Sequence, residues 1–442
     1  MTFQDLKLSK SLRRAIDDIG ITSPTPIQHK VFSPIMAGRD VVGIAQTGTG
    51  KTFAYLLPSL MLWKFTTSPA PQILVMVPTR ELVAQVVEEV KKLSTYLSLE
   101  VVGVYGGANI VPQIAAVEAG VDVVVGTPGR LLDLMLKGAL KTKKIKRLII
   151  DEVDEMLNLG FRTQLNNIIE FLPTKRQNLM FSATMPEEVE AIINNYTSYY
   201  EKIEAAPSGA ALENIEQYAY AANNFNTKAN LLKLLLDTDE DLSKVLVFVG
   251  TKKMANTLYE RMEPNFREQL GVIHSSKSQN NRFSTVNAFQ DGTYRFIIAT
   301  DVIARGLDVS QVTHVINFDL SDVAESYVHR IGRTGRAEKK GVAISFVSEK
   351  EQQNKEAIEN LMNIEIAMRE APEGLVVSEE LIDLEIPKDI VPFNNHKAKQ
   401  HKPSGDAFHE KLPANKKVNN KIHYETLMQK KYKKQYRKKN SR

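Results

Sequence analysis

Short apolar runs recur along the first half of the chain, and small, polar or charged residues follow each of them. The runs are Val41–Ile44, Ile73–Val77, Val101–Val104, Val121–Val125, Leu148–Ile150 and Leu179–Phe181. Amphipathic patterns of helical period, such as Glu81–Leu93, lie between them. This alternation predicts an α/β domain whose parallel sheet is covered by helices on both faces. Because ligands bind outside the carboxyl ends of such strands, the residues after each run are the candidate site.

The same alternation restarts in the second half of the chain. Its apolar runs are Val245–Val249, Val272–His274, Phe296–Ala299, His314–Asn317 and Val342–Phe346. Between the halves, Ala205–Ala211 is small, contains Pro and Gly and carries no charge, which is typical of a linker. We therefore expect two tandem α/β domains. Their predicted bounds are residues 1–205 and 214–371, with a linker at 206–213 and a tail at 372–442.

Two segments that follow apolar runs carry phosphate and metal chemistry. The first, Ala45–Thr52, ends in Gly-Lys-Thr, so Gly48 and Gly50 leave backbone N–H groups bare while Lys51 supplies a charge for phosphates. The second is Asp151-Glu152-Val153-Asp154. Either segment alone can be a solvated turn, but their shared place at strand ends favours a nucleoside triphosphatase.

The two segments divide the chemistry between them. Thr52 and Asp151 can share a Mg²⁺ ion, which prefers oxygen ligands and keeps several waters. Glu152, one residue further on, is then free to orient or deprotonate an attacking water.

The second half has no Gly-Lys-Thr loop, but it contains Tyr327–Arg336 with arginines at 330, 333 and 336. On a helical turn, this spacing would present the three guanidinium groups close to one face. Their forks match phosphate oxygens, so we expect the second domain to complete the site from across a cleft. The alternative is a solvated basic helix. Another loop after a strand, Ala299–Asp308, is suited to contacts with ribose or phosphate.

Composition narrows the class of protein. The chain has no cysteine, which excludes disulfides, Cys-based zinc sites and thiol catalysis. No apolar stretch is long enough for a membrane span, so we expect a soluble, cytoplasmic protein with no membrane partner.

Positive charge is concentrated at the end of the chain. From Phe393 to Arg442 there are 15 Lys and Arg against 3 Asp and Glu, a local charge of +12. Since the whole chain carries +5, residues 1–392 carry −7. Attraction to a polyanion is therefore concentrated in the tail.

These motifs, taken in order, resemble those of the DEAD-box ATP-dependent RNA helicases of superfamily 2, of the bacterial type with a basic C-terminal tail. The resemblance covers residues 3–347. It comprises Phe3 with Pro24-Thr25-Pro26-Ile27-Gln28, then AQTGTGKT, PTREL, GG, TPGR, DEVD in place of DEAD, SAT, ARGLD and HRIGRTGR. The family has two RecA-like domains with parallel sheets covered by helices, which agrees with the fold expected from the pattern.

The resemblance implies a role for each matching residue. ATP would be held by Phe3 and Gln28 at adenine, by Gly48, Gly50, Lys51 and Thr52 at the phosphates, and by Asp308 at ribose. Catalysis would use Lys51, Asp151, Glu152 and the fingers Arg333 and Arg336, with Mg²⁺ on Thr52 and Asp151. RNA would contact Thr79, Arg80, Gly107, Thr127, Gly129 and Arg130 in the first domain and Gln279, Arg282 and Thr300 in the second. Asp154, Ser182, Thr184 and His329 would couple the two domains.

The expected activity is RNA-stimulated ATP hydrolysis coupled to domain closure, with sequence-independent separation of short RNA duplexes or remodelling of RNA–protein complexes. The enzyme would act as a monomer. Two alternatives stay open: an ATP-gated RNA clamp with little unwinding, and a DNA helicase of the same superfamily, against which Phe3 and Gln28 argue. Val153, Ile21 and Ser275 depart from the family pattern. The lysine-rich tail, with interleaved tyrosines, favours disorder and either RNA attraction or simple solubilisation.

Overall fold

A computed structural model describes residues 2–46, 48–204, 214–301, 312–335 and 340–386. We call residues 2–204 the first lobe and residues 214–386 the second lobe. The predicted linker 206–213 and the predicted site residues Asp308 and Arg336 lie outside the described residues. No helix in the described ranges is long and apolar enough to cross a membrane.

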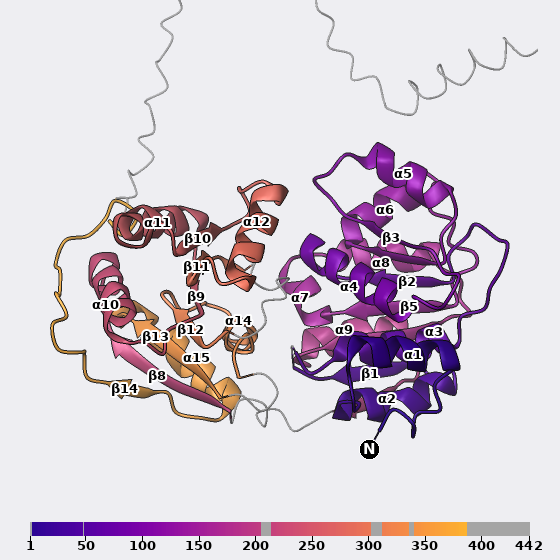
Figure 1. Cartoon of the computed structure of the whole chain (residues 1–442), viewed down its shortest axis with the longest axis horizontal. Helices are drawn as coiled ribbons and strands as arrows, with labels where there is room; N and C mark the ends of the chain where they lie inside the picture. Colours follow the sequence, from indigo (N-terminus) through magenta and orange to yellow (C-terminus); the bar gives the residue numbers. More distant parts are fainter. Residues whose placement is uncertain (1, 47, 205–213, 302–311, 336–339, 387–442) are drawn as a thin grey trace, which may run out of the picture. The chain divides into compact units, whose positions relative to one another are not determined.

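The first lobe is built on a seven-stranded parallel sheet (Figure 1). Its strands are β1 (Val41–Ile44), β2 (Ile73–Met76), β3 (Val101–Val104), β4 (Val123–Gly126), β5 (Arg147–Asp151), β6 (Gln177–Ser182) and β7 (Glu201–Glu204). Their order across the sheet is β3-β4-β2-β5-β6-β1-β7. The order places the predicted phosphate loop after β1 and the DEVD segment after β5 on either side of β6. These two segments and the SAT segment at the end of β6 therefore share one edge of the sheet.

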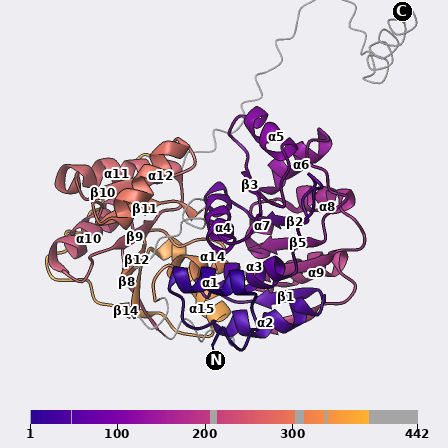
Figure 2. The ribbon, with the colours of Figure 1, turned by 45° about the vertical axis from the view of Figure 1, so that its right-hand side comes forward.

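Helices cover both faces of this sheet because successive strand residues point to opposite sides. Val75 and Ile149 lie in one apolar cluster, and their neighbours Leu74 and Leu148 lie in the other. The first cluster is covered by α1 (Lys10–Ile19), α2 (Pro26–Met36), α3 (Lys51–Met61) and α4 (Arg80–Leu93). The second is covered by α5 (Ile110–Glu118), α6 (Pro128–Leu136), α7 (Val153–Asn158), α8 (Arg162–Phe171) and α9 (Glu187–Tyr196). Figure 2 shows α1, α2 and α3 in indigo on their side of the sheet.

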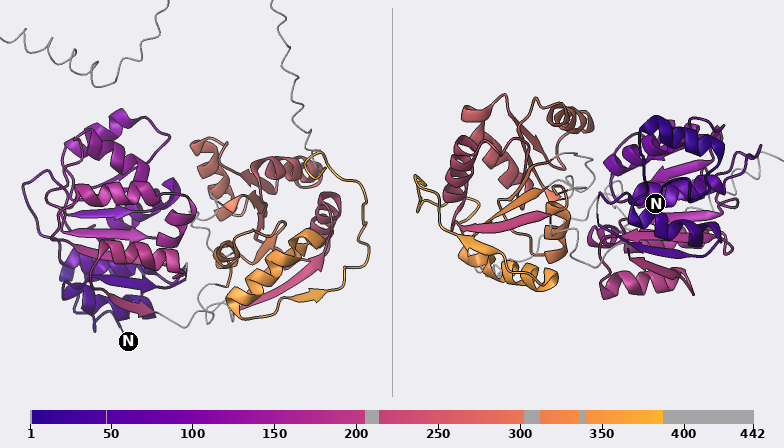
Figure 3. Two further views of the ribbon diagram at one scale, coloured as in Figure 1. Left: turned by 180° about the vertical axis from the view of Figure 1, so that it is seen from behind. Right: turned by 60° about the horizontal axis from the view of Figure 1, so that its bottom comes forward.

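The second lobe repeats this plan with another seven-stranded parallel sheet, in the order β10-β11-β9-β12-β13-β8-β14. Its strands are β8 (Ile215–Ala221), β9 (Val245–Phe248), β10 (Leu270–Ile273), β11 (Phe296–Ala299), β12 (His314–Asn317), β13 (Gly341–Val347) and β14 (Ala367–Arg369). One face is covered by α10 (Phe225–Thr238) and α11 (Lys252–Phe266). The other is covered by α12 (Gln279–Gln290), α14 (Ala324–Ile331) and α15 (Gln352–Met362), which follows the short 3₁₀ helix η2 (Glu349–Glu351). Figure 3 shows α15 and β14 in orange beside β8.

The α/β class with two RecA-like lobes is confirmed, and each predicted apolar run overlaps a strand. The pattern missed β7, β8 and β14. β7 is the charged sequence Glu-Lys-Ile-Glu and all three residues of β14 are exposed. Both lie at sheet edges, where one side of the strand is solvated and an apolar run is not required.

The second lobe continues beyond the predicted boundary at residue 371. Asn230 Nδ2 donates to Val376 O at 2.8 Å, and Ser378 N donates to Thr227 Oγ1 at 3.0 Å. The backbone N–H of Phe225, at the start of α10, donates to Glu385 Oε1 at 2.6 Å. Residues 372–386 therefore run along α10 as part of this lobe (Figure 1). The expectation that the tail begins at 372 is corrected to a start after Ile386, because the polar groups of α10 bind this segment.

Candidate functional site

The phosphate loop joins β1 to α3 and bends through two glycines. Gly48 has a φ of 83° and Gly50 a φ of 87°, a region that residues with a side chain rarely adopt. A Cβ on Gly50 would also collide with the amide of Gln28. Since α3 begins at Lys51, its free N–H groups and the positive end of its dipole face this loop. The local sequence therefore builds an anion site at the carboxyl end of β1.

Lys51 supplies the cation of this site. It is 6% exposed, and its Nζ is buried without a hydrogen-bond partner among the described residues. Burying an ammonium group costs on the order of several kcal/mol unless an anion accompanies it. The loop and the unpartnered Nζ together fit a phosphate group.

Gln28 supports the loop from α2. Its Oε1 accepts a hydrogen bond from Thr25 N at 3.0 Å, and its Nε2 donates to Gly50 O at 3.1 Å. These contacts leave one amide hydrogen and one lone pair for a base edge. Phe3, the other predicted adenine contact, is 6% exposed and packs in the apolar cluster beneath α1–α4. Adenine recognition by these two residues stays a prediction.

Asp151, the last residue of β5, is held by two hydrogen bonds. Its Oδ2 accepts from Tyr55 Oη at 3.0 Å, and its Oδ1 accepts from Glu152 N at 3.0 Å. Burial raises the pKa of Asp151, and the charge of Lys51 opposes that effect. Tyr55 is absent from the motifs read in the sequence. Its spacing of four residues from Lys51, which places both on one face of α3, is the signal that could have found it.

Glu152 occupies the turn between β5 and α7. Its φ of 55° and ψ of 55° are left-handed, a strained conformation that persists only where the surroundings hold it. Burial raises the pKa of Glu152 to about 7, while the charges of Lys51 and, less strongly, Arg333 act to lower it. Its Oε2 is buried without a hydrogen-bond partner in the described parts of the chain. A carboxyl group with a pKa near neutrality is matched to work as a general base.

Asp154 joins the DEVD segment to the end of β6. Its Oδ2 accepts from Ala183 N at 3.2 Å, from Thr184 N at 2.9 Å and from Thr184 Oγ1 at 2.8 Å, while its backbone N donates to Ser182 Oγ at 3.3 Å. His329 Nε2 of the second lobe lies 3.5 Å from the same Oδ2. Burial alone would raise the pKa of Asp154, but His329, and less strongly Lys51 and Thr184, outweigh it and hold that pKa well below its usual range. The four predicted coupling residues thus meet at one carboxylate.

Val153, the departure from the family's alanine, is 1% exposed and packs in the apolar cluster beneath α7. The change therefore adds apolar volume below the site and leaves the three carboxylates in place.

A cavity of about 470 Å³ lies at the carboxyl edge of the first sheet. It brings together six of the nine predicted RNA contacts, namely Thr79, Arg80, Thr127, Gly129, Arg130 and Arg282. Gly107 belongs beside them, because the guanidinium group of Arg80 lies at the place of its missing Cβ. Its φ of 73° is one that residues with a side chain rarely adopt. Thr300 follows β11 and is 8% exposed, and Gln279 is the first residue of α12.

Arg130 presents unused donors to this cavity. It is 7% exposed, its Nη2 donates to Ala108 O at 2.9 Å, and its Nη1 has no hydrogen-bond partner among the described residues. Arg282 forms a buried ion pair with Glu81 of α4. Burial lowers the pKa of Arg282, and Glu81 opposes that effect. The ion pair was not expected from the sequence, because the two residues are 201 positions apart.

The expectation that three arginines share one helix face is wrong for Arg330. Arg330 is 1% exposed and forms a two-pronged ion pair with Asp301, through Nε to Oδ1 at 2.5 Å and Nη2 to Oδ2 at 2.8 Å. Its Nη1 donates to Asp319 O at 2.6 Å. Helix α14 ends at Ile331, so Arg333 lies in the following turn. The guanidinium group of Arg330 therefore binds the strand ends of its own lobe.

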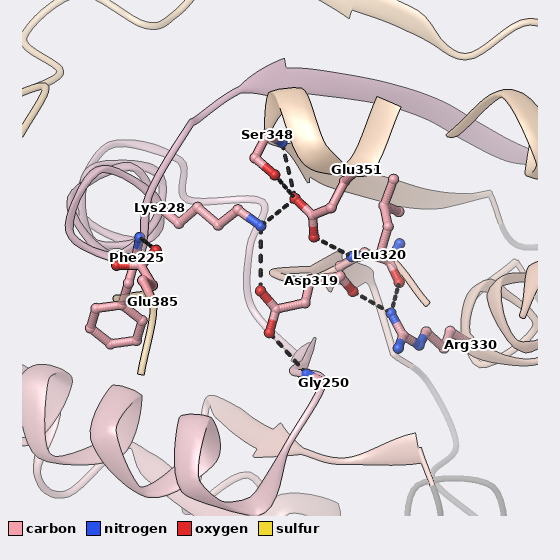
Figure 4. Close-up of polar contacts among 10 residues, drawn as sticks. Phe225, Lys228, Gly250, Asp319, Leu320, Arg330, Ser348, Glu351 and Glu385 are labelled. Atoms are coloured by element: carbon pink, nitrogen blue, oxygen red, sulfur yellow. Dashed lines mark hydrogen bonds and ion pairs between the residues drawn. The ribbon is translucent and has the colours of Figure 1, made fainter. Parts of the chain in front are cut away.

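A buried polar network supports these strand ends (Figure 4). Lys228 of α10 lies 2.7 Å from Glu351 Oε2 and 3.3 Å from Asp319 Oδ1. Asp319 accepts from Gly250 N at 2.9 Å, and Glu351 accepts from Leu320 N at 3.0 Å. One lysine therefore links the loops that follow β9, β12 and β13. No local motif marks Lys228, because its partners are 91 and 123 residues away.

Comparison with known proteins finds relatives that match both lobes. The DEAD/DEAH box helicase family matches residues 25–192, and the helicase conserved C-terminal domain matches residues 227–338. The DEAD-box ATP-dependent RNA helicase CshA of Geobacillus kaustophilus is 41% identical, over 79% of this chain and 74% of that protein. The ATP-dependent RNA helicase DbpA of Bacillus subtilis is 37% identical, over 89% of this chain and 80% of that protein.

Solved structures agree as well. Saccharomyces cerevisiae Dbp5 bound to RNA and ADP BeF3 is 29% identical with a TM-score of 0.76, covering 84% of this chain and 96% of that one. Mss116p bound to ssRNA and AMP-PNP is 28% identical with a TM-score of 0.76, covering 84% of this chain and 80% of that one. Because family models match both lobes and a relative is 41% identical over 79% of this chain, the chain belongs to the DEAD-box family of ATP-dependent RNA helicases.

Proposed function

We propose that this helicase hydrolyses ATP at the carboxyl edge of its first sheet and uses hydrolysis to hold and release single-stranded RNA in the cavity of Thr79, Arg80 and Arg130. The observation that carries the proposal is the cluster at Asp154. One carboxylate binds the Thr184 loop and lies beside His329, three residues from the Asp151 carboxylate. A change at the nucleotide therefore has a short route to the contacts between the lobes.

The residues present fit ATP and a Mg²⁺ ion. Lys51 and the glycine loop would bind the phosphates, since they offer an unpartnered cation and bare N–H groups. Asp151 and the Thr52 hydroxyl would hold the metal, which when bound neutralises phosphate charge. Glu152 would take a proton from the attacking water at its unpartnered Oε2. Arg333, whose charge already acts on Glu152, would stabilise the charge of the transferring phosphoryl group, with Arg336 as a second finger.

RNA would enter the cavity through its phosphates. Arg80 and Arg130 offer guanidinium forks. Thr79 and Thr127 offer hydroxyl groups, and Gly107 and Gly129 let the RNA backbone approach closely. Contacts to 2′-hydroxyl groups would discriminate RNA from DNA. Gln279, Arg282 and Thr300 would contact the strand from the second lobe.

The test is ATP-dependent displacement of one strand from a short RNA duplex. Wild type should displace the strand, and Lys51→Ala should not. Thr184→Val removes the hydroxyl bonded to Asp154 and should keep much of the ATPase activity while losing displacement. Thr197→Val is the matched control, because its hydroxyl bonds Asp40 at 2.7 Å away from the catalytic edge. Equal displacement by both valine variants would contradict the coupling role of Thr184.

The same assay separates the two alternatives. An ATP-gated clamp would retain single-stranded RNA with ATP bound yet displace no strand, and a DNA helicase would displace DNA strands equally well. A single RNA-binding chain needs no second copy, so a monomer is expected and light scattering tests it. The cytoplasmic location stays a prediction from the sequence.

A further inference from the structure

A group of lysines lies at the amino-terminal edge of the first sheet, opposite the catalytic edge. We call it the amino-edge patch and define it as Lys64, Lys141, Lys143, Lys144, Lys146 and Lys175. Lys141–Lys146 come directly before β5, Lys175 comes before β6, and Lys64 comes before β2. Because β2, β5 and β6 are neighbours in the order of the sheet, the amino ends of these strands lie side by side.

Backbone and side-chain hydrogen bonds fix the loops that carry the patch. Lys146 N donates to Gln72 O at 2.8 Å, and Gln177 N donates to Lys146 O at 2.9 Å. Thr142 Oγ1 donates to Phe171 O at 2.6 Å, and Gln72 Nε2 donates to Lys64 O at 2.6 Å. Ile145, in the middle of the lysine run, is 1% exposed and anchors the loop in the apolar cluster. The cations are therefore presented from an ordered surface.

The patch is unneutralised as well as exposed. All six lysines are exposed, and none of them forms an ion pair within the described part of the chain. By contrast, Lys91, Lys92 and Lys202 of the same lobe each pair with a glutamate. The acidic groups on neighbouring elements include Glu118, Asp122, Glu170 and Asp40. Asp122 accepts a hydrogen bond from Trp63 Nε1 at 3.0 Å, and Asp40 accepts from Asn178 N at 2.7 Å.

This surplus stands out because residues 1–392 carry a net charge of −7. Like charges gathered on an ordered surface repel one another and hold a local excess of counter-ions. A polyanion releases those counter-ions on binding, which favours association in low salt. A polyanion spans several of these cations at once, whereas a small anion meets one or two.

We propose that the amino-edge patch is a second RNA-binding surface, which binds the phosphate backbone of duplex or folded RNA flanking the strand held at the catalytic edge. This inference rests on the RNA binding proposed above. A strand of five residues spans about 17 Å, and the sheet with its covering helices separates the patch from the catalytic edge. The patch would hold the helicase beside structured RNA without reading its sequence.

The experiment compares two RNAs in the full-length protein. One is a single strand of about 10 nucleotides, near the size of one binding track, and the other is the same strand extended by a hairpin. The patch variant is Lys141→Gln, Lys143→Gln and Lys144→Gln together. The control is Lys91→Gln, Lys92→Gln and Lys233→Gln, which removes the same charge from lysines that have carboxylate partners. Affinity is measured by fluorescence anisotropy across a range of salt concentrations.

The patch variant should bind the hairpin RNA more weakly, by up to roughly a hundredfold near 0.1 M salt, with a log–log salt slope shallower by about two units. Its affinity for the short strand and its turnover at saturating short strand should equal those of wild type. In a second variant, Glu118→Gln, the loss of an exposed negative charge beside Lys141 should tighten binding of the hairpin RNA alone.

Parallel salt slopes for wild type and the patch variant would overturn the inference. So would an equal loss for both RNAs, or an equal loss in the control variant, since neither needs a remote surface. Failure of the proposed function looks different, because then the short strand would not stimulate ATP hydrolysis in wild type either.

Discussion

Replacement of Tyr55 by phenylalanine tests whether α3 positions the carboxylate that is proposed to hold Mg²⁺. The change removes one buried hydroxyl, which donates to Asp151 Oδ2 at 3.0 Å, and keeps the ring that packs against Phe181 at a centroid distance of 5.3 Å. Among the described residues, Asp151 would then keep only the hydrogen bond from Glu152 N. The carboxylate loses its fixed orientation, while the apolar packing around it stays.

Two magnitudes follow from this geometry. A hydrogen bond to a charged acceptor contributes about 1.5–3 kcal/mol, which corresponds to a fall of roughly 3–12 °C in the unfolding temperature of a lobe of this size. A residue that orients a metal ligand changes metal affinity by about 10- to 100-fold. We therefore expect Tyr55→Phe to need about 10- to 100-fold more Mg²⁺ for nucleotide binding.

The assay is binding of a fluorescent ADP analogue as a function of Mg²⁺ concentration, with ATP turnover measured in parallel. Tyr196→Phe is the matched control, because Tyr196 also has a mostly buried hydroxyl, which donates to Asn166 Oδ1 at 2.7 Å. Both variants should lose stability, but only Tyr55→Phe should shift the Mg²⁺ dependence. The same Mg²⁺ dependence in both variants would refute the positioning role of Tyr55.

Three further predictions concern other parts of the chain. Glu152→Gln should bind ATP normally and hydrolyse it at least about 100-fold more slowly, because it removes the proposed base; near-normal turnover in a rapid-quench assay would remove Glu152 from that role. Lys228→Met should destabilise the second lobe by about 3–5 kcal/mol, because it leaves two partly buried carboxylates unpaired. Lys233→Met removes a lysine from an exposed pair and should cost under about 1 kcal/mol. Equal unfolding temperatures for the two variants would contradict the role of the network. Truncation after Pro392 should weaken RNA binding and flatten its salt dependence without changing turnover at saturating RNA, and parallel slopes would favour a solubilising tail.

The sequence determined the class of fold and all but one of the inner strands. Fully buried parallel strands must be apolar on both faces, so every inner strand except β8 appears as an apolar run. β8 is partly exposed and was missed. Edge strands carry no such requirement, which is why β7 and β14 were invisible. The glycines at 48, 50 and 107 could also be understood in the sequence, because residues with a side chain rarely adopt their conformations.

Tertiary structure decided which distant residues meet. Arg330 looks like its neighbours at 333 and 336 in the sequence, yet it is paired with Asp301 inside the second lobe. Lys228 and Glu81 lie in no pattern that reveals a partner, and the ion pairs they form join segments 91 to 201 residues apart. Tyr55 reaches Asp151 across 96 residues. The physical reason is that periodicity records which face of an element is buried. The desolvation cost of a buried charge or hydroxyl is offset only by a hydrogen-bonding or charged partner, and folding brings that partner to it.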